Sequence, residues 1–321
     1  MAQRATVRRV LGTGAVIALL VIDVALVSLA LQRDDPAPAT PTPVVTLPDP
    51  TDEPDPAGTA GDATPTVSPT STEALTPAPL TRLVVALDAT HAWRVDVGAC
   101  TDGGSAVATS ADGGRTWVTR RSPLRTITRL RASSAESAFV IGADATCSPA
   151  MRTTTDSGQT WTGAAGVDRS WFRDPASTAV IHTSRDRSVR PCQGGAAVVD
   201  LLPASSARAT VICGDGQVRS SGDSGSTWTA SGSATRALAA ASDQGRDTWV
   251  ARPGADQGCA GITVVRASRP TAVVGCAAVS LAGVSPGSVA LSAAGSSGWL
   301  LVGDRTLRSS DGMKTWRLAS G

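Results

Sequence analysis

Paired carboxylates are the first catalytic chemistry to look for in this sequence, because aspartate is common in it. Glycoside hydrolysis needs two carboxyl groups about 5–10 Å apart across a cleft. Most aspartates stand in turn-forming contexts such as Asp102-Gly103 and Asp215-Gly216, where a structural role in the turn is sufficient. Glu136 is the one glutamate after residue 80. No pair of carboxylates stands out as a catalytic couple.

A nucleophilic serine is the second chemistry to consider. Residues 222–225 read Gly-Asp-Ser-Gly and match the signature around the nucleophile of trypsin-like proteases. A triad also needs a histidine, and the chain offers His91 and His182, each interpreted as an ordinary surface or edge residue. Ser224 itself takes the variable position of a repeated turn described below, which is filled elsewhere by Gly113, Ser157 and Gly312. The motif is therefore interpreted as structural.

Binding is the function that residues 169–192 indicate, because adjacent aromatic side chains lie among arginines there, as in an interface anchor. The candidate binding residues are Trp171, Phe172, Arg173, His182, Arg185, Arg187 and Arg190. The alternative is that Trp171 and Phe172 fill a hydrophobic core while the arginines are solvated. The segment also interrupts the repeat described next, and such departures often mark function.

Four segments share one pattern, which sets the expected fold. Three fit Ser/Thr-x-Asp-x-Gly-x-Thr-Trp in full, and the fourth has Met313 in place of the glycine, which predicts a distorted turn. Aspartate accepts hydrogen bonds from turn amides, glycine supplies a positive φ, and tryptophan offers a large apolar face to neighbouring sheets. The pattern residues are Asp112, Gly114 and Trp117; Asp156, Gly158 and Trp161; Asp223, Gly225 and Trp228; and Asp311 and Trp316.

The spacing of the repeats matches a propeller blade. Asp112 and Asp156 are 44 residues apart, and Asp223 and Asp311 are 88 apart, twice that period. Blades of four strands typically take about 40–50 residues. The sequence thus predicts an all-β propeller of four-stranded antiparallel sheets, with six blades favoured and seven possible. The expected blades are residues 83–124, 125–166, 167–195 (short and irregular), 196–232, 233–280 (repeat lost) and 281–321.

The repeat resembles the Asp-box, or bacterial neuraminidase repeat. Propellers of that superfamily include sialidases, sortilin-type receptor ectodomains and the photosystem II assembly factor group. The resemblance covers residues 83–321 and implies that the aspartates hold hairpin turns at the blade edge, away from any active centre. Sialidases use a tyrosine nucleophile paired with a glutamate, and this chain contains no tyrosine. Sialidase activity is therefore not expected.

The cysteines predict disulfides. All six lie after residue 80, and an even number outside the cytoplasm is typical of disulfide bonding. Cys100 and Cys147 follow the same strand in adjacent blades, so a bond between them would tie two blades together. A sequential pairing would be completed by Cys192 with Cys213 and by Cys259 with Cys276, although connectivity does not follow from sequence. Because no Cys-x-x-Cys or Cys/His cluster occurs, neither a metal nor a cofactor is expected.

The N-terminal quarter predicts a membrane anchor. Residues 10–31 form an apolar run of 22 residues, long enough to span a bilayer. The arginines in residues 1–9 should stay in the cytoplasm, which sends the rest outward. The alternative is a cleaved signal peptide, whose apolar core usually spans about 7–15 residues. Residues 32–80, rich in proline and threonine, are expected to form a disordered stalk. The role of Asp23 within the run stays open.

These features favour a single-pass plasma-membrane protein whose residues 81–321 form an extracytoplasmic propeller. The formal net charge is +2 without a basic block, so nucleic acid is not an expected partner. We expect a non-enzymatic module that binds or scaffolds a protein, peptide or cell-envelope glycan. The alternatives are a divergent glycoside hydrolase or other glycan-processing enzyme that uses aspartates, and an assembly factor for a membrane complex. Two facing carboxylates in a deep cleft, beside stacked tryptophans, would favour the enzyme.

Overall fold

The computed structural model describes residues 79–101, 103–164, 166–243 and 247–319. The expected cytoplasmic residues 1–9, the apolar run 10–31 and all but the end of the stalk 32–80 lie outside this part of the chain. The predictions made for them therefore stay predictions. No helix within the described ranges combines the length and apolar character needed to span a membrane.

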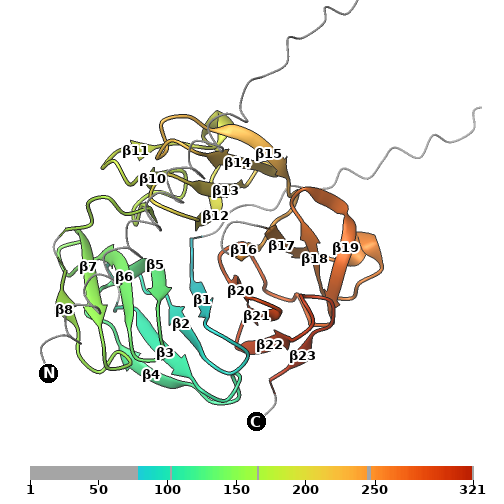
Figure 1. Ribbon diagram of the computed structural model, residues 1–321, viewed down its shortest axis with the longest axis horizontal. Helices are drawn as coiled ribbons and strands as arrows, with labels where there is room; N and C mark the ends of the chain where they lie inside the picture. The colour runs from blue at the N-terminus through green and yellow to red at the C-terminus, as the bar shows by residue number, and fades with distance from the viewer. Residues whose placement is uncertain (1–78, 102, 165, 244–246, 320–321) are drawn as a thin grey trace, which may run out of the picture. The chain divides into compact units, whose positions relative to one another are not determined.

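Six antiparallel sheets follow one another along the described chain, and each is built from consecutive strands (Figure 1). Blade 1 contains β1 (Arg82–Ala86), β2 (Ala92–Asp96), β3 (Ala106–Ser110) and β4 (Val118–Arg121). Blade 2 contains β5 (Thr126–Ala132), β6 (Ala138–Ala143), β7 (Pro149–Thr154) and β8 (Thr162–Gly163). Blade 3 contains β9 (Phe172–Arg173), β10 (Ile181–His182) and β11 (Ser188–Val189), followed by the 3-10 turn η1 (Gln193–Gly195).

The second half continues in the same way. Blade 4 contains β12 (Val198–Pro203), β13 (Ala209–Cys213), β14 (Gln217–Ser221) and β15 (Thr229–Ser233). Blade 5 contains β16 (Ala239–Asp243), β17 (Asp247–Pro253), the 3-10 turn η2 (Ala255–Gln257), β18 (Ile262–Arg266) and β19 (Arg269–Ala277). Blade 6 contains β20 (Val289–Ala294), β21 (Ser297–Val302), β22 (Arg305–Ser309) and β23 (Arg317–Leu318).

The sheets close into a ring, which confirms the predicted six-bladed propeller. The first strand of each blade contacts the first strand of the next, and β20 contacts β1 to complete the circle (Figure 1). Blade 3 departs from the expected four strands, since its described sheet has three, in the order β11-β10-β9. No strand is exchanged between the described parts of blades 1 and 6, so contacts between the two sheets close the ring.

The four repeat turns (residues 110–117, 154–161, 221–228 and 309–316) share one hydrogen-bond network. In the first, the Ser110 hydroxyl donates to Asp112 Oδ1 at 2.9 Å and accepts from the Gly114 amide at 2.8 Å. Asp112 also accepts from the amide of Thr116 at 3.0 Å and from its hydroxyl at 2.6 Å. The same four contacts recur in the other three turns. Each aspartate thus holds its own turn closed.

The distortion predicted for the fourth turn is not found, so that prediction is wrong. Met313 takes a φ of 71°, and its amide donates to Ser309 Oγ at 3.0 Å, as the glycines do elsewhere. Its buried side chain fills space left by Gly298, where an added Cβ would lie 2.3 Å from the Met313 sulfur. At the matching register position the other repeats carry alanine, namely Ala92, Ala138 and Ala209.

Tryptophan side chains join neighbouring blades. Trp93 of blade 1 is fully buried, and its Nε1 donates to the Ser134 carbonyl of blade 2 at 2.9 Å. Trp299 of blade 6 donates in the same way to the Asp88 carbonyl of blade 1 at 2.9 Å. Trp117 of blade 1 packs edge-on against Trp299, with ring centroids 6.0 Å apart. Trp117 therefore packs between sheets, as its place in the repeat predicts. Trp93 and Trp299, which lie outside the repeat turns, join neighbouring blades as well.

Three disulfides occur in the sequential pairing described above. Cys100–Cys147 joins loops of blades 1 and 2, and Cys192–Cys213 joins the end of blade 3 to β13 of blade 4. Cys259–Cys276 lies within blade 5. Two of the three bonds therefore link neighbouring blades.

Candidate functional site in the central cavity

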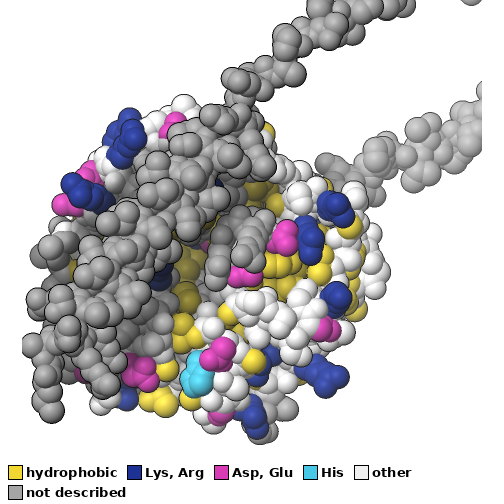
Figure 2. Space-filling view, in the orientation of Figure 1, with side chains coloured by type: hydrophobic (Ala, Val, Ile, Leu, Met, Phe, Trp, Pro, Cys, Tyr) yellow, Lys and Arg dark blue, Asp and Glu magenta, His cyan; other side chains and the backbone are white. Residues whose placement is uncertain are grey.

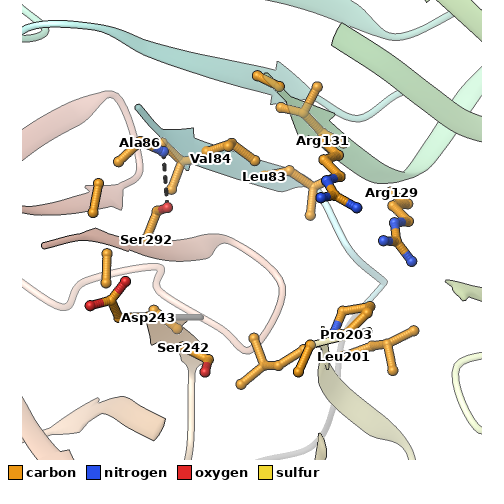
Figure 3. A pocket seen from close by; sticks show the side chains of 18 of the residues that line it. Leu83, Val84, Ala86, Arg129, Arg131, Leu201, Pro203, Ser242, Asp243 and Ser292 are labelled. Atoms are coloured by element: carbon orange, nitrogen blue, oxygen red, sulfur yellow. Dashed lines mark hydrogen bonds between the residues drawn. The ribbon is translucent and has the colours of Figure 1, made fainter. Parts of the chain in front are cut away.

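The inner strands of the ring surround a cavity of about 1020 Å³. Apolar side chains gather around the hollow on the face shown in Figure 2. Leu83 of β1 and Leu201 and Pro203 of β12 contribute to this apolar lining (Figure 3). A few charged side chains interrupt it, and they decide what the cavity can bind.

Two arginines form a cationic wall on one side. Arg129 and Arg131 are two positions apart on β5, so their side chains leave the same face of the strand, and both extend toward the cavity (Figure 3). The Arg129 guanidinium donates to the Trp171 carbonyl and lies 5.6 Å from the centre of the Phe139 ring. The guanidinium of half-buried Arg129 is thereby fixed in position, whereas Arg131 is exposed.

The pair concentrates positive charge. Burial, and to a lesser extent the charge of Arg131, lowers the pKa of Arg129 to about 10. At that pKa the Arg129 guanidinium is still charged at neutral pH. None of the ion pairs within the described ranges involves either residue. Two adjacent cations without an acidic neighbour are arranged to receive an anionic group.

Two carboxylates also line the cavity. Asp243, on β16, faces the cavity opposite the arginines (Figure 3). Asp88, after β1, accepts hydrogen bonds from the amides of Thr90 at 2.5 Å and His91 at 2.7 Å, and lies 2.9 Å from His91 Nδ1. These contacts, the Thr90 amide foremost, hold the pKa of Asp88 well below its usual range. Asp88 is therefore an ionised turn support and is unsuited to act as a general acid.

The aromatic pair predicted to anchor a partner is buried. Trp171 is 2% exposed and Phe172 is 1% exposed. Trp171 Nε1 donates to the carbonyls of Ser205 and Ser206 in blade 4, at 2.9 and 3.1 Å. It thus joins blades 3 and 4 as Trp93 joins blades 1 and 2. Both rings lie in the core, as the alternative interpretation expected, and neither ring is exposed for a surface contact.

Arg173 and His182 also hold blade 3 together. Arg173 is 7% exposed and donates to the Val199 carbonyl at 3.0 Å. Burial lowers its pKa, while the charge of Asp200 opposes this effect. The His182 ring stacks on Phe172 at 4.2 Å between centroids, and its Nε2 lies 2.8 Å from Asp174 Oδ2.

The other predicted binding arginines lie on the surface, apart from the central cavity. Arg185, Arg187 and Arg190 are exposed, and none of them lines the cavity. Arg187 Nη2 donates to Ser226 Oγ of blade 4 at 2.6 Å, and Arg185 Nη1 reaches the same oxygen at 3.5 Å. The seven predicted residues therefore do not form one site.

Sequence reasoning missed Arg129 and Arg131. A signal for them exists in Thr126–Ala132, where arginine alternates with apolar residues along the first strand of a blade. Because that strand lies nearest the axis, alternate side chains face the cavity. Within the described ranges no group of three or more metal-ligating side chains could hold a metal ion.

The strand order and the cavity define a six-bladed β-propeller with one cationic inner wall. No family model matches the chain, and no curated protein matches it. Among solved structures, YCF48 bound to a D1 peptide is 18% identical, with a TM-score of 0.39, over 76% of this chain and 83% of that one. YCF48 from Cyanidioschyzon merolae is 17% identical, with a TM-score of 0.36, over 76% and 87%.

A glycoside hydrolase is also among the similar structures. The GH74 xyloglucanase from Xanthomonas campestris is 14% identical, with a TM-score of 0.29, over 74% of this chain and 38% of that one. At such scores the function must be inferred from the side chains of the cavity.

Proposed function

We propose that this chain is a non-enzymatic, membrane-anchored extracytoplasmic module whose central cavity binds an anionic group of a protein, peptide or cell-envelope glycan. The observation that carries the proposal is the pair Arg129 and Arg131, which project from one inner strand into the cavity without an acidic partner in the described ranges. Charge-assisted hydrogen bonds from guanidinium to a carboxylate or phosphate would supply affinity.

The carboxylates favour binding over hydrolysis. A glycosidase general acid needs a raised pKa so that it can hold a proton at neutral pH. The pKa of Asp88 is held low by its own turn, so the described lining of the cavity offers Asp243 no second carboxyl suited to donate a proton. Trp171 is the tryptophan in the described lining, and its indole ring is buried rather than free to stack on a sugar.

An extracytoplasmic location is supported by the three disulfides, which form and persist in oxidising compartments. The apolar residues 10–31 would provide the anchor. Membrane fractionation, with mass spectrometry of the purified N-terminus, separates a retained anchor from a cleaved signal peptide. If the propeller lies outside the cytoplasm, a membrane-impermeant reagent should label it in intact cells.

Binding can be measured by calorimetry with matched probes on the full chain in non-ionic detergent. The probes are a glutamate-rich peptide against its glutamine counterpart, and an oligosaccharide of glucuronic acid against its neutral glucose counterpart. We expect an acidic probe to bind. The affinity for that probe should fall about tenfold in Arg131→Gln, because one charge-assisted contact is lost. Arg121→Gln, an exposed arginine of β4, serves as the control.

Equal binding of acidic and neutral probes, or equal affinity of the wild type and Arg131→Gln, would overturn the proposal. Release of new reducing ends from either oligosaccharide would instead support the hydrolase alternative. That activity should then disappear in Asp243→Asn.

A further inference from the structure

A second cavity, of about 350 Å³, lies where blade 1 meets blade 6. Three arginines line it: Arg115 in the first repeat turn, Arg308 on β22 and Arg317 on β23. Its described lining contains no acidic side chain. None of the three arginines takes part in the ion pairs found within the described ranges.

This arrangement costs stability when the cavity is empty. Arg308 and Arg317 are directly opposite each other in the β22–β23 register. Like charges at such positions repel and destabilise a sheet. Arg115 brings a third positive charge from the neighbouring blade. An anion bound between the three guanidinium groups would attract each of them and offset their mutual repulsion.

The guanidinium of Arg308 is held in place before any ligand arrives. It lies 4.9 Å from the centre of the Trp299 ring, within the range of a cation–π contact. The guanidinium also lies close to Gly113, where an added Cβ would lie 2.0 Å from Arg308 Nη1. Arg308 Nε is buried and has no hydrogen-bond partner within the described ranges. The missing side chain of Gly113 therefore makes room for this guanidinium.

Arg115 is oriented by its own turn. Its Nε donates to the Asp112 carbonyl at 3.0 Å, so its terminal nitrogens are left to bind a ligand. The planar fork of donors on each guanidinium matches the oxygens of a phosphate or sulfate. Three such forks suit a doubly charged oxyanion better than a single carboxylate.

We propose that this seam cavity, lined by Arg115, Arg308 and Arg317, binds a phosphate or sulfate group. The ligand bridges the first and last blades, so its binding energy also stabilises the closed ring. The site shares no residue with the central cavity, and its test is independent of the proposed function.

The test uses the full chain in non-ionic detergent with inorganic phosphate, inorganic sulfate or chloride at matched ionic strength. Thermal unfolding is followed by tryptophan fluorescence, and affinity is measured by calorimetry. Phosphate or sulfate should raise the melting temperature saturably above its value in chloride. Glycerol 3-phosphate and vesicles of phosphatidylcholine containing phosphatidic acid then separate a soluble phosphate ester from a lipid headgroup as the source.

Arg317→Gln is the decisive variant, because Arg317 is exposed and its loss leaves the Trp299 packing intact. We expect it to weaken phosphate or sulfate binding about tenfold or more, since a charge-assisted contact is lost. Arg308→Gln should also weaken phosphate or sulfate binding, while Arg121→Gln should bind these anions with the affinity of the wild type. The proposal is overturned if chloride stabilises as well as phosphate and sulfate, if Arg317→Gln binds like the wild type, or if Arg121→Gln weakens binding equally.

Discussion

The turn aspartates are held ionised by the hydrogen bonds that they accept. Contacts from the following threonine lower the pKa of three of them to about 2 and lower that of Asp311 as well. The pKa of an aspartate in an unfolded chain is about 3.9. Because the folded pKa is the lower one, the stabilisation is complete above about pH 4 and is lost as the pH falls toward about 2. The three with a pKa of about 2 are Asp112, Asp156 and Asp223.

The pH dependence of stability should therefore change when one of these carboxylates is removed. In Asp223→Asn we expect a smaller fall in melting temperature between about pH 4 and about pH 2 than in the wild type. Asp304→Asn, at an exposed aspartate without a hydrogen bond to the described residues, is the control and should keep the wild-type slope. Thermal unfolding at each pH checks this. Identical slopes in Asp223→Asn and the wild type would contradict the assignment.

Two glycines of one turn differ sharply in what they can tolerate. Gly225 has a φ of +83°, and an added Cβ would lie 2.5 Å from Thr183 Cγ2 of blade 3, whereas nothing lies within 4 Å of such an atom at Gly222. We expect Gly225→Ala to lower the free energy of unfolding by about 1–3 kcal/mol. Gly222→Ala should change it by less than about 0.5 kcal/mol. Urea denaturation of both variants measures the difference, and equal effects would refute this packing argument.

At the scale of the element, the last repeat shows two substitutions that compensate each other. Met313 occupies a glycine position, and Gly298 occupies an alanine position in the adjacent strand. Gly298→Ala should cost about 1–3 kcal/mol because the new methyl overpacks against the Met313 sulfur. In the Met313→Gly background the same change should cost less, because only the contact of the new methyl with Trp316 Cη2, at 2.9 Å, remains.

A double-mutant cycle by urea denaturation measures this coupling. We expect a coupling energy of about 1–3 kcal/mol, as for residues in contact. A coupling energy near zero would show that the two positions are independent and that the fourth turn tolerates methionine for another reason.

The repeat allowed most elements to be predicted, because its residues act locally. Serine, aspartate and glycine close a turn with their own side chains and backbone, so five of the six blades follow from spacing and strand pattern. The third blade could not be predicted in detail. There Trp171 precedes the first strand of its blade, yet it makes the contact that Trp93 makes from a second strand. The repeat spacing does not reveal that the inter-blade tryptophan comes from a different place in this blade.

The candidate site was harder to predict for a related reason. Arginines beside aromatic rings look alike in sequence whether they are buried or exposed. Arg173 is enclosed between blades, while Arg131 faces the cavity. The difference depends on which strand lies nearest the axis, and that is a property of the closed ring. A local motif therefore predicts the turns better than the cavity that the turns help to build.

At the scale of the whole molecule, the seam between blades 6 and 1 differs from the other five. Neighbouring blades elsewhere are joined by the chain, and blades 1 and 2 also by Cys100–Cys147. At the seam the described contacts include main-chain bonds from the amides of Thr81 and Arg82 to the Gly287 carbonyl, at 2.8 and 3.1 Å, as well as side-chain contacts. They include the Trp299–Asp88 hydrogen bond and the donation from the Ala86 amide to Ser292 Oγ at 2.9 Å. Opening the seam therefore separates two blades without unfolding either.

Two matched tryptophan variants can detect this opening by hydrogen exchange. Trp299→Phe and Trp93→Phe each remove one indole hydrogen bond between blades, worth about 1 kcal/mol. In Trp299→Phe, exchange of the Ala86 amide and of the β1 and β20 edges should accelerate about fivefold to tenfold, because seam opening is local. In Trp93→Phe, the amides of β1 and β5 should stay close to wild type, since the chain and a disulfide keep those blades together. If both variants accelerated exchange equally at their own boundaries, the seam would be no weaker than the boundary between blades 1 and 2.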